Sequence, residues 1–171
     1  MKQRLTASFF QNDVLTVAPQ LLGKKIIRVY PNGQINEFLI TETEAYRGED
    51  DLACHASKGR TARTEVMYLN GGHVYVYLIY GMYWMLNFVT STPNNPQAVL
   101  IRGIEGFNGP GKLTKHLQID KSFNYENLEN SERLYVSEYL ANVSYKTATR
   151  IGIDYAGDYW KNRPWRFILE Q

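Results

Sequence analysis

The sequence predicts an α+β domain built around a mainly antiparallel β-sheet. Segments rich in β-branched and aromatic residues follow one another along the chain, and few helical segments interrupt them. The turns between these segments are short and contain glycine, proline and asparagine. Strands joined in this way pair antiparallel. A length of 171 residues suffices for one core, so we expect a single domain over residues 1–171.

The composition narrows the class of protein. Hydrophobic residues make up 44% of the chain and charged residues 21%, which is typical of a globular protein. The net charge of +2 permits an anionic partner without requiring one. Cys54 is the only cysteine, so we expect no disulfide and no cysteine-based metal site. The sequence has no membrane-spanning stretch or signal-peptide pattern, so we expect an intracellular protein, cytoplasmic and nucleoid-associated if bacterial.

A short helix is expected near the N-terminus. Thr16 is suited to cap it, Pro19 then falls in its first turn, and the helix ends near Leu22. Gly23 supplies the left-handed residue that terminates it.

The remaining elements follow from the pattern of apolar and turn residues. Two further short helices are expected over 64–69 and 112–119, and a turn or short helix over 158–162. The expected strands cover 24–30, 34–46, 73–80, 83–90, 98–104, 134–137, 149–153 and 164–169.

The strand over 73–80 is unusually rich in tyrosine. Because side chains alternate along a strand, Tyr75 and Tyr77 share one face. Tyr80 has the opposite parity and precedes the break at Gly81, so it is expected to point beyond the sheet edge. Tyrosines in a half-buried strand usually serve packing, but this arrangement could also serve both a pocket and a projecting contact.

Two glutamates and one arginine suggest a buried polar site. Glu42 and Glu44 lie two residues apart on one strand, and either could form a surface ion pair or act as a general base. Arg102 sits between apolar residues, so an inward-facing guanidinium requires a carboxylate partner, and either glutamate could supply it. Asn87 is a second polar residue in an apolar strand, suited to a base edge.

Other motifs carry weaker signals. Cys54 and His55 are adjacent, so their side chains point apart on an extended chain and cannot form a catalytic pair alone. The segment from Gly106 to Lys112 has the spacing of a phosphate-binding loop, but Leu113 replaces the required hydroxyl residue. A helix starting there could still hold a DNA phosphate.

Together these residues resemble the alkyladenine (3-methyladenine) DNA glycosylase family, from about Phe9 to the end of the chain. That resemblance implies a single mixed domain around a curved antiparallel sheet with a protruding β-hairpin. The matching motifs are Glu42-Thr-Glu-Ala-Tyr46, His55, Val76 to Tyr83, Asn87, Arg102 and Gly109-Pro-Gly-Lys-Leu113.

The resemblance implies a hydrolase that flips alkylated or deaminated purines out of duplex DNA and cuts the N-glycosidic bond. Glu44 would activate the attacking water and Arg102 would help to position it. Tyr77 and Tyr46 would stack on the two faces of the base, with His55 at its edge. Neither metal nor cofactor is implied. No lysine is placed as a Schiff-base nucleophile, so we expect a monofunctional enzyme.

Further roles follow from the same resemblance. The Ala53 carbonyl would accept a hydrogen bond from the base, and Asn87 would discriminate against the exocyclic amine of guanine. Tyr80 would wedge into the gap left in the duplex. The expected partner is double-stranded DNA containing damaged purines, and the expected state is a monomer. The expected contacts to the DNA backbone are Arg60, Arg63, Met82 and Lys112.

One alternative is a protein that binds nucleic acid without catalysis, using the tyrosines as a stacking platform. It accounts for the aromatic residues and for the basic loop over 58–63. It leaves Glu44 and Arg102 unexplained, because a carboxylate in a phosphate-facing groove weakens binding.

Overall fold

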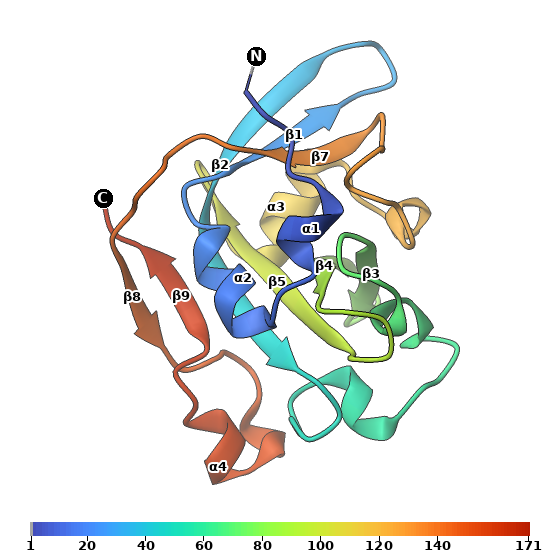
Figure 1. Cartoon of the computed structure of the whole chain (residues 1–171), viewed down its shortest axis with the longest axis vertical. Helices are drawn as coiled ribbons and strands as arrows, with labels where there is room; N and C mark the ends of the chain where they lie inside the picture. The colour runs from blue at the N-terminus through green and yellow to red at the C-terminus, as the bar shows by residue number, and fades with distance from the viewer. Residues whose placement is uncertain (1) are drawn as a thin grey trace.

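Residues 2–171, which the computed structural model describes, contain nine strands in one mainly antiparallel, curved sheet (Figure 1). The predicted α+β class is therefore confirmed. The strands are β1 Lys25–Val29, β2 Ile35–Arg47, β3 Val74–Ile79, β4 Tyr83–Thr90, β5 Gln97–Ile104, β6 Phe107–Asn108, β7 Leu134–Ser137, β8 Tyr145–Ala148 and β9 Arg166–Leu169. The helices are α1 Ala7–Phe10, α2 Val14–Gln20, α3 Pro110–Leu117 and α4 Asp158–Lys161, with 3₁₀ turns η1 His55–Lys58, η2 Glu65–Tyr68, η3 Lys121–Phe123 and η4 Asp154–Ala156.

The long strand β2 is the centre of the sheet. The main strand order is β3-β4-β5-β2-β1-β7, and β9 also pairs with β2 and carries β8. The first half of β2 pairs with β1, whereas its second half lies between β5 and β9. The register shifts around Glu42, so the strand is irregular where it passes from one set of partners to the next.

Helices α1 and α2 cover one face of this sheet (Figure 1). Apolar residues of α2, including Val14 and Val17, are fully buried against the sheet. Thr43 faces this layer, since its hydroxyl donates to the Ala18 carbonyl at 2.9 Å. Side chains alternate along a strand, so Glu44 must point to the opposite face of β2.

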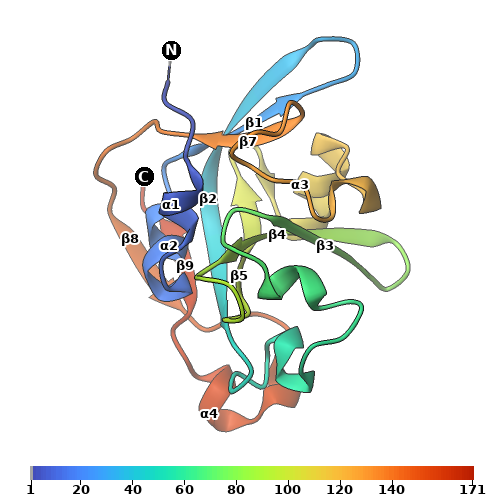
Figure 2. The same ribbon diagram turned by 45° about the vertical axis from the view of Figure 1, so that its right-hand side comes forward.

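The β3–β4 hairpin projects from the side of the molecule (Figure 2). Its turn places Tyr80 at φ 52° and Gly81 at φ 64°, and the Met82 N–H donates to the Ile79 carbonyl at 3.1 Å. Positive φ is uncommon for tyrosine, but the favoured tight hairpin turns require it at both central residues, so the turn accounts for this conformation. The side chains of Tyr80 and Met82 are 87% and 63% exposed. The predicted projecting hairpin is present, although Tyr80 lies in the turn and not in the strand.

The predicted N-terminal helix is present as α2, but its cap and the position of Pro19 were predicted wrongly, and one predicted strand is absent. Helix α2 is capped by Asp13, whose carboxylate accepts from the Leu15 N–H at 2.9 Å, so Thr16 is already inside the helix. Pro19 consequently lies in the helix interior and not in its first turn. The expected strand over 149–153 is a loop. The Ile151 N–H donates to the Glu44 carboxylate and Arg150 donates to Asp51, so these groups bind side chains and not a neighbouring strand.

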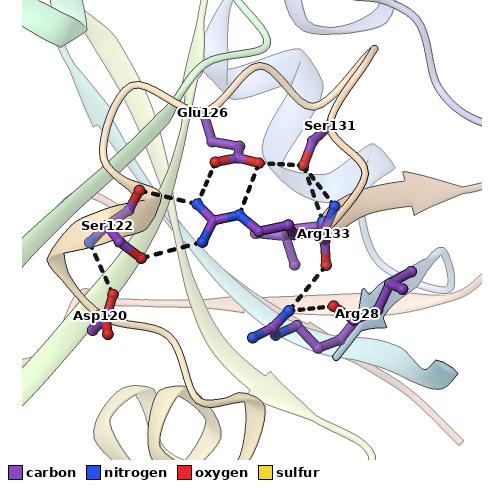
Figure 3. A network of polar contacts seen from close by, with 8 residues as sticks. Arg28, Asp120, Ser122, Glu126, Ser131 and Arg133 are labelled. Carbon is purple, nitrogen blue, oxygen red and sulfur yellow. Dashed lines mark hydrogen bonds and ion pairs between the residues drawn. The ribbon is translucent and has the colours of Figure 1, made fainter. Parts of the chain in front are cut away.

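A polar network fixes the long segment between α3 and β7 (Figure 3). The guanidinium of Arg133 binds the Glu126 carboxylate, which also accepts from the Ser131 hydroxyl, and this pairing lowers the pKa of Glu126. Arg133 also donates to the Ser122 carbonyl at 3.0 Å. Arg28 on β1 donates to the Arg133 carbonyl at 3.3 Å, which anchors the segment to the sheet.

The same segment covers the free edge of β3. The Val74 N–H donates to the Glu126 carbonyl at 2.8 Å, and the Tyr125 N–H donates to the Val74 carbonyl at 2.9 Å. The network of Figure 3 therefore supports the base of the projecting hairpin. Within residues 2–171 no helix is long and apolar enough to cross a membrane.

A buried ion pair joins the loop after β2 to the segment before η4. Arg150 donates to the two carboxylate oxygens of Asp51 at 2.6 and 3.0 Å, and neither side chain is accessible to solvent. Arg150 also donates to the Ala45 carbonyl at 3.1 Å, and Asp51 accepts from the Ala53 N–H at 3.1 Å. The pair is bidentate and each ion has further hydrogen bonds, as a buried pair requires.

The substitution Asp51→Asn should lower the free energy of unfolding by about 3–5 kcal/mol, because it leaves Arg150 buried without a counter-charge. Urea unfolding measured by circular dichroism checks this. Asp158→Asn, in the exposed pair with Lys161, is the matched control and should leave the midpoint unchanged. Equal midpoints for the two variants would contradict the structural role of the buried pair.

Candidate active site

A cavity of about 550 Å³ lies on the face of the sheet opposite α2. Its wall is formed by strands β3, β4 and β5, the loop after β2, the N-terminus of α3 and the loop over 151–155. Most of the lining is aromatic or apolar, with few polar groups. This is the usual composition of a small-molecule site, and the volume lies within the usual range for such sites.

Strand register brings the predicted residues to this one face. Glu44 on β2 pairs with Leu100 on β5, which in turn pairs with Asn87 on β4, and Asn87 pairs with Tyr75 on β3. Directly opposed residues in an antiparallel sheet share a face. Residues two positions along point the same way. Tyr77, Arg102 and Tyr46 therefore join this row, as the period of two predicts.

Glu44 is a fully buried carboxylate that contacts three residues of the cavity lining, namely Tyr46, Arg102 and Ile151. Its Oε1 accepts from Arg102 Nη1 at 3.1 Å, and its Oε2 accepts from the Ile151 N–H at 2.7 Å. The Tyr46 hydroxyl lies 3.4 Å from Oε1. Burial raises the pKa of Glu44, while Arg102 and the Ile151 N–H oppose that rise.

Glu42 occupies a different position. Arg102 bridges the two glutamates, since its Nε lies 3.6 Å from Glu42 Oε1. Glu42 is also bound by Arg166 at 2.9 Å. The sequence left open whether Glu42 or Glu44 is the partner of Arg102, and the structure shows that both are. Only Glu44 is enclosed by residues of the cavity wall, so Glu44 is the candidate base and Glu42 a counter-charge.

His55 and two tyrosines form an aromatic cluster on one wall. The ring centroids of His55 and Tyr77 are 4.5 Å apart, and His55 Nδ1 lies 2.8 Å from the Tyr75 hydroxyl. Burial, with smaller contributions from Arg63 and Lys58, lowers the pKa of His55 to about 4. The imidazole is therefore neutral at physiological pH. Burial also raises the pKa of Tyr77, which keeps that ring neutral.

The two remaining predicted base contacts also line the cavity. Asn87 is buried, and its amide donates to the Tyr75 carbonyl at 3.2 Å, which fixes its orientation. The Ala53 carbonyl accepts from the Tyr155 hydroxyl at 3.1 Å. Neither Tyr155 nor Ile151 was anticipated: Ile151 falls in the segment that the sequence pattern assigned to a strand, and Tyr155 lies just beyond it in η4.

The predicted backbone contacts are dispersed. Arg60 pairs with Glu65 at 3.3 Å, whereas the Arg63 guanidinium lies 5.2 Å from the centroid of the Tyr77 ring. Lys112 is exposed in the first turn of α3, and Met82 is exposed at the hairpin tip. None of the four is among the residues that line the cavity.

The weaker motifs have structural explanations. Cys54 is buried, and burial raises the pKa of its thiol to about 12, so it is not an activated nucleophile. The glycine-rich segment folds back as β6 antiparallel to β5, unlike a phosphate-binding loop. A Cβ on Gly111 would lie 2.8 Å from the Tyr83 ring, so close packing against the hairpin explains that glycine. Within residues 2–171 no three His, Cys, Asp or Glu side chains are grouped to hold a metal.

Comparison with known proteins gives a consistent result. The model of the methylpurine-DNA glycosylase family matches residues 8–171. A Rickettsia felis protein is 44% identical over 172 residues, covering 96% of this chain and 92% of its own length. A Borreliella afzelii protein is 46% identical, covering 95% and 94%, and one from Methanocella arvoryzae is 44% identical, covering 95% and 90%. All three are named provisionally as 3-methyladenine DNA glycosylases.

The family match spans the whole site described above, from the strand that carries Glu44 to the loop that carries Ile151. It confirms the resemblance seen in the sequence motifs. The chain belongs to the methylpurine-DNA glycosylase family.

Proposed function

We propose that the protein is a monofunctional DNA glycosylase that releases alkylated or deaminated purines from duplex DNA and leaves an abasic site. The observation that carries this proposal is the ion pair between the buried Glu44 carboxylate and Arg102, which lines an aromatic cavity. A buried carboxylate beside a guanidinium is suited to activate water, and the aromatic walls are suited to hold a base.

Glu44 acts as the general base in this proposal. Water adds to the anomeric carbon, the N-glycosidic bond breaks, and the base departs with the bonding electrons while Glu44 takes the proton of the water. Ring alkylation makes the purine cationic, so it leaves as a neutral molecule. A deaminated purine is neutral, so it leaves as an anion and takes a proton from solvent. The Tyr46 hydroxyl donates a long hydrogen bond of 3.4 Å to Glu44 Oε1. If the Tyr46 hydroxyl moved away, the water could bind Glu44 Oε1 beside Arg102.

The cavity would hold the base by stacking and by its edge. Tyr77 and Tyr46 offer ring faces, His55 offers a neutral edge, and Ala53 and Asn87 contribute polar contacts. Aromatic stacking can return about 1–3 kcal/mol per base, which offsets the few kcal/mol needed to extrude it. Electron-rich rings also favour a cationic base.

The projecting hairpin and the basic residues would meet the DNA. Tyr80 is 87% exposed at the hairpin tip and also borders the cavity, so it can enter the gap left by an extruded base. Met82, Arg60, Arg63 and Lys112 would contact the backbone around that point. We propose that the protein acts as a monomer on genomic DNA, with no metal or cofactor.

The substitution Glu44→Gln should lower single-turnover base release about a hundredfold or more, because the amide cannot accept a proton from water. Free base released from a duplex with one lesion, measured by chromatography, checks this. Glu105→Gln on the exposed surface is the matched control and should release base at the wild-type rate. Retained lesion binding without release in the wild type would favour a non-catalytic binding protein. Full activity of Glu44→Gln would remove Glu44 from the mechanism.

The substitution Tyr80→Ala should weaken capture of an extruded base and slow its release by about tenfold or more, since the stacking lost at the gap is no longer replaced. Fluorescence of 2-aminopurine placed opposite or beside the lesion reports the distortion of the duplex. Tyr139→Ala, exposed beyond β7 at the far end of the sheet order, serves as the control. Unchanged fluorescence together with unchanged release would argue against a wedge at Tyr80.

A further inference from the structure

The Tyr155 hydroxyl is positioned at one edge of the cavity by a single hydrogen bond. It donates to the Ala53 carbonyl at 3.1 Å, and both residues line the cavity. The side chain of Tyr155 is 71% exposed, so its ring stands at the cavity mouth while its hydroxyl reaches inward. The resemblance assigns the Ala53 carbonyl to the base, so Tyr155 occupies one of its two acceptor positions.

Both partners of this bond are held in place. The Ala53 N–H donates to the buried Asp51 carboxylate, which also accepts from the Arg47 N–H and from Arg150. Arg150 is followed directly by Ile151, whose N–H binds Glu44 at 2.7 Å. The loop that carries Tyr155 is therefore fixed at the same points as the catalytic carboxylate.

The bond between Tyr155 and Ala53 is not the main connection between the two loops that carry these residues. The buried pair of Asp51 and Arg150 already joins the same two loops with two charge-assisted bonds. A neutral hydroxyl at a solvent-accessible rim adds little to that linkage. Its distinctive property is chemical, because a hydroxyl can donate and accept hydrogen bonds whereas a carbonyl only accepts.

We propose that Tyr155 is a specificity-determining residue that allows the pocket to take purines bearing either an amino or an oxo group at the edge that faces Ala53. This inference rests on the proposed function. An amino group donates to the free acceptor position of the Ala53 carbonyl or to the Tyr155 oxygen. The oxygen of an oxo group would face the Ala53 carbonyl oxygen, and the lone pairs of the two oxygens would repel each other. The hydroxyl proton of Tyr155, placed between the two oxygens, relieves that repulsion.

The test uses the single-atom substitution Tyr155→Phe, which keeps the ring and removes the donor. Single-turnover release of hypoxanthine from a duplex with one deoxyinosine is compared with release of 3-methyladenine from methylated duplex DNA. Hypoxanthine release should fall about fivefold, as expected for one neutral hydrogen bond, while 3-methyladenine release is kept or increased. Tyr159→Phe, exposed on α4 outside the cavity wall, is the control and should leave both rates unchanged.

The ratio of the two rates is the decisive readout, since a general loss of stability or of DNA binding lowers both together. A ratio equal to that of the wild type, with both rates lowered or both unchanged, would overturn the role of Tyr155 and leave the proposed glycosylase intact. A wild-type protein that releases neither base, while the duplexes remain intact, would overturn the proposed function itself. Melting temperatures of both variants verify that the folded state is retained.

Discussion

The ion pair between Glu44 and Arg102 is the interaction on which the site depends. A carboxylate with no solvent exposure is costly unless it is paired and hydrogen-bonded, and here a guanidinium and the Ile151 N–H meet that cost. The three groups come from β2, β5 and a loop more than a hundred residues beyond Glu44. The three groups therefore surround the carboxylate only in the folded chain.

The architecture explains how such a group is placed beside an aromatic cavity. The paired register of β2, β5, β4 and β3 carries Glu44, Asn87 and Tyr77 along one face, while α2 packs against the other. The buried pair of Asp51 and Arg150 then fastens the loops that complete the wall. The hairpin that presents Tyr77 to the cavity also carries Tyr80 to the exposed tip, so one element links pocket and surface.

Local sequence patterns predicted the parts of this site that lie on strands. A period of two is enough to place Tyr75 and Tyr77 on one face, and an arginine among apolar residues is enough to require a carboxylate. Local patterns could not predict the roles of Tyr155 and the Ile151 N–H. Their segment does not pair with a strand, and its shape depends on residues distant in the sequence, such as Asp51. The cap of α2 was missed for a related reason, since Asp13 and Thr16 are both competent caps by residue type.

The proposed general base, Glu44, has a pKa that burial raises and Arg102 lowers. The most direct test is the pH dependence of single-turnover release of a methylated purine, for the wild type and for Arg102→Gln. Release should fail as the pH falls through the pKa of Glu44, above the usual glutamate range because burial raises it. Removing the guanidinium, which lowers that pKa, should move the acidic limb to higher pH. An acidic limb at the same pH in both proteins, or none in the wild type, would contradict the account.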